Sequence, residues 1–173
     1  NTNNNFDQAE DFLSFAIEIE RKFGFRSHEA GSLRFYSEIY AKKKSMEMAG
    51  IFARKALTIY HEIEDTKGQS RTLQHFGELA KQQEKFAEAE DFYNQALAID
   101  RETGDRKGES GLLYQLGLLA KQQEKFTEAE DFYNLALAID RELLDKSGES
   151  LMLYRLGLLA KQQEKFAEAE DFY

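Results

Sequence analysis

Adjacent carboxylates recur along the chain and are the first residues whose type could support catalysis. Glu90-Asp91, Glu130-Asp131 and Glu170-Asp171 offer the side chains that general acid–base catalysis or a divalent cation requires. Neighbouring residues on a helix point about 100° apart, so the two carboxylates of each pair diverge. A pair that returns every 40 residues on an outer helix face is typical of a solvated surface. We therefore expect neither catalysis nor metal binding at these pairs.

The three histidines are no better placed for chemistry. His28, His61 and His75 lie in unrelated contexts, and no pair of them has the spacing of metal ligands. Ser27, His28 and Glu29 are consecutive, which is poor geometry for a nucleophile, a base and an orienting carboxylate. The sequence predicts no catalytic residue, no metal site and no cofactor, and an enzyme is the least favoured class.

Composition narrows the remaining classes of protein and of binding partner. The 173 residues include no proline, which favours long uninterrupted helices, and no cysteine, which removes disulfides and thiolate sites. The formal net charge of −9 has the wrong sign for a nucleic-acid or anionic-membrane binder. No apolar run approaches the roughly 20 residues that would span a bilayer. We expect a soluble, cytoplasmic, all-α protein that binds neither nucleic acid nor membrane.

An internal repeat organises the elements that carry these residues. The string AKQQEKF begins at Ala80, Ala120 and Ala160, which fixes a period of 40 residues. Two more divergent copies precede it without insertion or deletion. The predicted repeats are a partial one holding a second helix only, three full ones and a truncated one: 1–26, 27–66, 67–106, 107–146 and 147–173.

Each period contains two amphipathic stretches. The first runs over about 68–83 and the second over about 87–103, each with an apolar stripe at three- and four-residue spacing. Gly77 stands within the first stripe, where it would let a neighbouring helix approach closely. Gly104 stands where a left-handed residue would end the second helix, and Gly24 and Gly148 are expected in neighbouring loops.

The chain resembles the tetratricopeptide repeat family, in a variant whose unit is about 40 residues. The pattern that carries the resemblance is L-x-x-F-G-x-L-A followed by F-x-x-A-x-x-F-Y-x-x-A-L-x-I, from Leu73 to Ile99 and in its repeats. The resemblance implies a right-handed superhelical solenoid of antiparallel helix pairs. It also implies that the first helices line a concave groove that binds a peptide or a partner helix.

The repeats differ from each other mainly in their first helices. At about 100° per residue, Gln74, Glu78 and Lys81 share a face that lies away from the apolar stripe. The resemblance makes this face the lining of the groove. Its predicted residues, in repeat order, are Arg34, Glu38, Gln74, Glu78, Lys81, Tyr114, Leu118, Lys121, Tyr154, Leu158 and Lys161.

This face changes character along the chain. It is polar and mixed in charge in the earlier repeats, and becomes a shelf of tyrosine and leucine edged by lysines in the later ones. Such a shelf suits an amphipathic helix or an extended segment with apolar anchors and an acidic flank. The same tyrosines and leucines could instead only widen the contact between successive first helices. Both interpretations stay open.

The predicted function is a scaffold that binds a protein or peptide through this groove, without catalysis. One alternative is the sensor or regulatory arm of a larger effector such as an NTPase or a protease. Another is head-to-tail self-association, because both ends are cut within a repeat and neither carries the polar cap that repeat arrays need. The same uncapped ends lead us to expect a segment of a longer protein.

Overall fold

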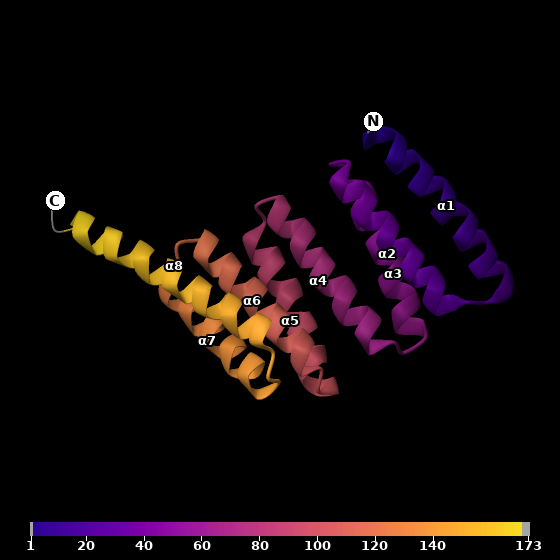
Figure 1. Ribbon diagram of the computed structural model, residues 1–173. Helices are drawn as coiled ribbons and strands as arrows, with labels where there is room; N and C mark the ends of the chain where they lie inside the picture. The colour runs from indigo at the N-terminus through magenta and orange to yellow at the C-terminus, as the bar shows by residue number, and fades with distance from the viewer. Residues whose placement is uncertain (1, 171–173) are drawn as a thin grey trace. The chain divides into compact units, whose positions relative to one another are not determined.

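The computed structural model describes residues 2–170, which form eight α-helices joined by short turns (Figure 1). Their bounds are α1 Thr2–Phe23, α2 Arg26–Lys42, α3 Met46–Glu62, α4 Thr66–Gln82, α5 Phe86–Thr103, α6 Arg106–Gln122, α7 Phe126–Glu142 and α8 Lys146–Glu170. The predicted all-α class is therefore confirmed. The helices α2, α4, α6 and α8 each begin one residue before a predicted repeat boundary, and we refer to them as first helices and to the others as second helices.

The chain divides between Ile99 and Asp100 into two compact units. In the first unit α2 packs against α1 and α3, and α4 packs against both α3 and α2. In the second unit α7 packs against α6 and α8. Within each unit successive helices run antiparallel, as short turns require (Figure 1).

All seven turns end the preceding helix with a left-handed residue. Gly104 has φ of 72°, as predicted for a helix-ending glycine, and Gly24, which was expected in a loop, has φ of 73°. Five other turns place a side-chain-bearing residue in the same conformation, among them Leu144 with φ of 56°. Each turn also closes with a backbone bond of the Schellman type, such as Asp145 N to Asp140 O at 2.8 Å. The turn geometry is thus kept even where the residue disfavours it.

The expected loop position of Gly148 is wrong. Gly148 lies in the first turn of α8, and its backbone N–H donates to Asp145 at 3.0 Å. Asp65 and Asp105 cap α4 and α6 in the same way. A side chain at Gly148 would collide with the carboxylate of Asp140, so this glycine is required by close packing and not by a loop.

Alternating small and large residues form the core of the pairs. In the first unit, one cluster joins three adjacent helices: Ile17, Ala30, Leu33, Ala56, Ile59 and Tyr60. Between α4 and α5, the Tyr93 ring lies against Gly77, where an added Cβ would be 2.4 Å from the ring. Gly117 and Tyr133 repeat this contact between α6 and α7. The predicted close approach at Gly77 is therefore confirmed.

The truncated repeat at 147–173 differs from the others at its expected turn. Residues 83–85 and 123–125 separate a first helix from a second helix, and the same sequence was expected to form a turn at 163–165. There α8 instead continues as one helix to Glu170. The same Gln-Glu-Lys sequence therefore takes both conformations in this chain, so local sequence alone does not determine the turn.

Candidate binding surface

A groove between the first helices α2 and α4 brings four predicted residues together. Arg34 and Glu38 line it from α2, and Gln74 and Glu78 line it from α4. The groove has a volume of about 470 Å³ and its further lining residues are Ala41, Lys42, Arg71, His75 and Gln82. Its two walls come from equivalent positions of consecutive repeats, which is why residues 40 apart in sequence face each other.

Local contacts on each wall hold the groove side chains in place. Arg34 forms an ion pair with Glu38 one helical turn away, and its guanidinium lies 5.1 Å from the Phe35 ring. On the opposite wall, Gln74 Nε2 donates to Glu78 Oε1 at 3.4 Å. Side chains restrained in this way lose less conformational entropy when a ligand binds.

His75 connects the groove to the buried interior. Its Nε2 lies 2.7 Å from Ser37 Oγ, and this same hydroxyl donates its only hydrogen to the carbonyl oxygen of Ala49 at 2.7 Å. The His75 Nε2 must therefore carry the hydrogen that Ser37 accepts. The other ring nitrogen, Nδ1, lies 3.8 Å from Glu78 Oε2 on the groove wall. This bridge between α2 and α4 fixes the position of the groove floor.

The three lysines predicted to edge the groove, Lys81, Lys121 and Lys161, have different surroundings. Lys81 is half-buried, with its ammonium 5.9 Å from the centre of the Tyr93 ring. Burial lowers the pKa of Lys81, although the charge of Glu78 opposes the change. Lys121 is partly buried and Lys161 is exposed. Lys81 thus contacts the helix pair as much as it offers a charge to a ligand.

Tyr114 and Tyr154, predicted as equivalent anchors, have different surroundings. The Tyr114 hydroxyl accepts a hydrogen bond from Arg155 Nη2 at 2.8 Å, and the guanidinium lies 5.5 Å from the Tyr114 ring. Tyr114 therefore joins α6 to α8. Tyr154 is 61% exposed, while Leu118 and Leu158 are partly buried. Only Tyr154 presents most of its ring to solvent.

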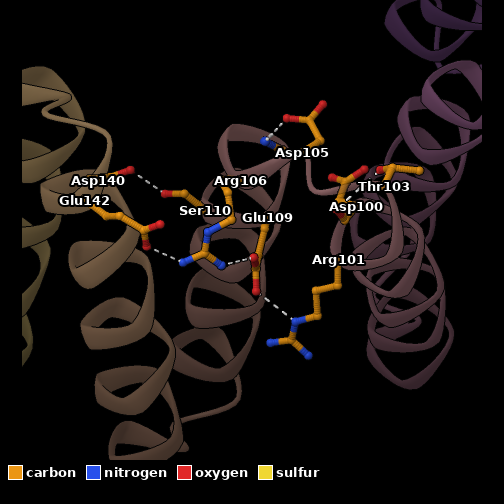
Figure 2. Close-up of polar contacts among 10 residues, drawn as sticks. Asp100, Arg101, Thr103, Asp105, Arg106, Glu109, Ser110, Asp140 and Glu142 are labelled. Carbon is orange, nitrogen blue, oxygen red and sulfur yellow. Dashed lines mark hydrogen bonds and ion pairs between the residues drawn. The ribbon is translucent and has the colours of Figure 1, made fainter.

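Buried carboxylates occur at several positions, of which the sequence analysis had considered only Glu29. Figure 2 shows Glu109 between two arginines: Arg101 Nε donates to it at 2.8 Å, and Arg106 also binds it. The same Arg106 reaches Glu142 at 2.6 Å. Ser110 Oγ donates to Asp140 at 2.5 Å nearby. An equivalent arrangement in the first unit joins Arg21, Arg26, Glu29 and Glu62.

The arginines keep these buried carboxylates ionised. Burial alone would raise the pKa of Glu109, but hydrogen bonds from Arg101 and Arg106 outweigh burial and hold the pKa below its ordinary value. The same opposition lowers the pKa of Glu29. A carboxylate held ionised by two cations is a poor general acid or base near neutral pH. These groups fasten adjacent helices to each other.

Three charged or titratable groove residues were missed by sequence reasoning. Arg71 precedes Gln74 by three residues and Glu78 by seven, so helical spacing alone could have placed it on this face. Lys42 is the last residue of α2 and lies eight residues after Arg34, so it could also have been placed near this face. His75 had no signal, because its partner Ser37 is 38 residues away in sequence.

None of the helices in residues 2–170 is both long and apolar enough to cross a membrane. Among the same residues, no three His, Asp or Glu side chains gather as metal ligands would. The paired carboxylates Glu90-Asp91 and Glu130-Asp131 do not line the groove between α2 and α4, and Asp171 of the third pair lies outside the described residues.

Antiparallel helix pairs that recur every 40 residues define a helical repeat protein. The family model of the tetratricopeptide repeat matches residues 28–102 and 109–173, and the chain belongs to this family. The predicted family is therefore confirmed. A comparison with curated protein sequences found no significant match.

Solved structures of low sequence identity share the fold. BtubC (BKLC) from P. vanneervenii is 20% identical with a TM-score of 0.80, and the match covers 91% of this chain and 66% of that one. Aspartyl phosphate phosphatase F from Bacillus subtilis is 19% identical with a TM-score of 0.78, covering 96% and 45%. The STAND protein PH0952 from Pyrococcus horikoshii, which has a tetratricopeptide repeat sensor, is 18% identical with a TM-score of 0.73, covering 85% and 23%. The chain thus spans about two thirds of the first structure and under half of the other two.

Proposed function

We propose that this protein is a non-catalytic scaffold that binds a protein or peptide in the groove between α2 and α4. The observation that carries the proposal is the convergence of Arg34, Glu38, Gln74 and Glu78 on one groove of about 470 Å³. The contacts described above restrain these side chains before any ligand arrives, which lowers the entropic cost of binding. The absence of cysteine fits a role in the reducing cytoplasm.

The charges of the groove define the kind of segment that it would accept. Arg71 and Lys42 stand exposed on opposite walls, while Arg34 is already paired with Glu38. A segment with one or two acidic side chains would meet both exposed cations, and its amides could bond with Gln74 and Gln82. In the second unit, the exposed ring of Tyr154 would serve as an apolar anchor for the same kind of ligand.

The test is a selection of binding peptides followed by measurements on variants. Peptides selected from a random displayed library would be synthesised with a fluorophore, and their affinities measured by anisotropy. We expect Arg71→Ala combined with Gln74→Ala to weaken binding at least tenfold, because two polar contacts are lost. Lys107→Ala changes an exposed lysine outside the groove and is the matched control. If the double variant binds the selected peptides as tightly as the unchanged protein, the groove is not the site.

A second candidate is the sensor arm of a larger regulatory protein. The observation that favours it is the share of each matching structure that this chain covers: 45% of phosphatase F and 23% of PH0952, so both proteins extend well beyond the matched part. In such a protein the groove would bind the signal, and an attached domain would respond. The test is the activity of the intact protein with and without a selected peptide. An activity that a saturating peptide does not change would contradict this second candidate.

A further inference from the structure

The charged side chains of the groove between α2 and α4 follow an alternating order along its length. On the α2 wall, Arg34, Glu38 and Lys42 recur every four residues, so they lie along one side of that helix. At a rise of about 1.5 Å per residue, successive charges are about 6 Å apart and the two cations about 12 Å apart. This wall therefore presents a positive, a negative and a positive charge in turn.

The α4 wall adds a second cation at the end of the groove where Arg34 lies. The helices α2 and α4 run in the same direction, because α3 is antiparallel to both (Figure 1). The bond of 2.7 Å between His75 Nε2 and Ser37 Oγ sets the register of the two helices. Arg34 precedes Ser37 by three residues and Arg71 precedes His75 by four, so the two arginines stand at similar heights.

A buried phenol supports the proximity of the two arginines. Burial raises the pKa of Tyr60, and the charges of Arg34 and Arg71 oppose this rise. Both guanidinium groups therefore lie near one hydroxyl, although they come from different helices. This end of the groove offers two cations to an acidic side chain.

Two carboxylates occupy the middle of the groove. Glu38 and Glu78 hold equivalent repeat positions on the two walls, and their side chains are 33% and 38% exposed. A basic side chain that lies between them would contact one carboxylate from each wall. Beyond them, Lys42 and Gln82 line the far end of the groove, and both are exposed.

An extended segment matches the spacing of these charges. In an extended chain every second side chain points the same way, and at about 3.3 Å per residue these side chains are about 6.6 Å apart. Three of them span about 13 Å, close to the distance between the two cations of the α2 wall. A helical ligand fits poorly, because one turn about 10 Å wide and 5.4 Å long already occupies roughly 420 Å³. The groove has about 470 Å³ in all.

We propose that the groove binds an extended segment of a partner protein in which an acidic, a basic and an acidic side chain alternate, with one residue between each. One acidic side chain meets Arg34 and Arg71, and the other meets Lys42. The basic side chain lies between Glu38 and Glu78. The pattern is the same in both chain directions, so it fits the groove in either. This inference rests on the proposed scaffold function and specifies the ligand of the same groove.

The test compares two synthetic peptides of the same composition and net charge. Both are blocked at their ends, flanked by serines and labelled with a fluorophore; one contains Glu-Ser-Lys-Ser-Glu and the other Lys-Ser-Glu-Ser-Glu. By anisotropy, we expect the alternating peptide to bind about tenfold more tightly, because shuffling brings like charges together at two positions. Added salt should reduce this difference, since it screens exposed charge pairs.

Reversing one charge of the groove should reverse its preference. Glu78→Lys should bind a Glu-Ser-Glu-Ser-Glu peptide more tightly than the alternating one, whereas the unchanged protein should prefer the alternating one. Arg71→Gln, which changes an exposed side chain, should weaken binding of the alternating peptide several-fold. Lys107→Ala lies outside the groove and should behave like the unchanged protein. Circular dichroism of each variant verifies that the helices are retained.

The outcomes separate the charge pattern from the scaffold function itself. Equal binding of the alternating and shuffled peptides, or no binding of either at millimolar concentration, would overturn the proposed pattern. A folded Glu78→Lys protein that still prefers the alternating peptide would overturn it too. If library-selected peptides are nevertheless weakened by Arg71→Ala with Gln74→Ala, the groove binds another kind of segment and the scaffold function stands. If they are not, the scaffold function fails as well.

Discussion

Replacing Gly77 by alanine tests whether helix pairs are held as closely as the structure shows. The added Cβ would lie 2.4 Å and 2.6 Å from two carbons of the Tyr93 ring, well inside van der Waals contact. The Tyr93 side chain is fully buried and the opposing atoms are α4 backbone, so the ring has no open space to move into. Overpacking of this kind costs about 1–3 kcal/mol.

Helix propensity changes the free energy of unfolding in the opposite direction, so its effect has to be separated from the overpacking. Alanine is favoured over glycine by about 0.8–1.0 kcal/mol in a helix interior. Gly111 lies within α6 and an added Cβ there meets nothing, so Gly111→Ala should gain this amount without penalty. The difference between the two variants then isolates the overpacking, with Gly77→Ala less stable than Gly111→Ala by about 1–3 kcal/mol.

The assay is urea unfolding followed by far-UV circular dichroism, at a protein concentration low enough to avoid self-association. The slope of the free energy with urea should be similar for both variants, because it reports the surface exposed on unfolding. A Gly77→Ala protein as stable as Gly111→Ala would refute the close contact with Tyr93. Gly117→Ala, which faces Tyr133 at 2.5 Å, should repeat the loss in the next pair.

Three further changes have expected outcomes. Leu144→Gly should raise the free energy of unfolding by about 1 kcal/mol, because Leu144 is left-handed and exposed; unchanged urea unfolding would argue against that turn. Glu109→Gln should cost about 1–3 kcal/mol at pH 7 through the lost charged hydrogen bonds. The pKa of Glu109 is lowered in the folded state, so its contribution to stability is present above the ordinary value of 4.5 and is lost as pH falls through the folded pKa. In thermal melts, the melting temperature of Glu109→Gln should therefore fall less on acidification than that of the unchanged protein. An equal fall in both proteins would contradict the ion pairs. Burial raises the pKa of Tyr133 to about 12, and its hydroxyl has no hydrogen-bond partner in residues 2–170. Tyr133→Phe should therefore leave the free energy of unfolding in urea unchanged or raise it by about 1 kcal/mol. A clear loss of stability would reveal a partner for the hydroxyl.

The sequence was sufficient for the helices and their order because the repeat removes the usual ambiguity. A period shown by AKQQEKF places each turn once one turn is located, and the small residue at Gly77 indicates where helices touch. The conformation of the third AKQQEKF was not predictable, because the same residues form a turn at 83–85 and 123–125 but stay helical within α8. The left-handed conformation of Leu144 was not predictable either, because leucine rarely adopts it.

The candidate site was predictable where it depends on repeat position alone. Arg34 and Gln74 share a position, and the helical period puts Glu38 and Glu78 on the same face, so their convergence follows from stacking first helices. The division of roles between Tyr114 and Tyr154 was not predictable. It depends on Arg155 of α8, which donates a hydrogen bond to Tyr114 of α6, and such a tertiary contact cannot be inferred from repeat position.

The sequence separation between the partners of the polar contacts matters for how a repeat protein gains copies by gene duplication. Arg26 to Glu62 and Arg106 to Glu142 are each separated by 36 residues, and Ser110 to Asp140 by 30. All three spans are shorter than the period, so a duplicated segment of 40 residues that starts at or just before the first partner carries both partners of each contact. Such a duplication keeps these three contacts without a compensating mutation, whereas the bond from Arg155 to Tyr114 spans 41 residues and needs two successive copies.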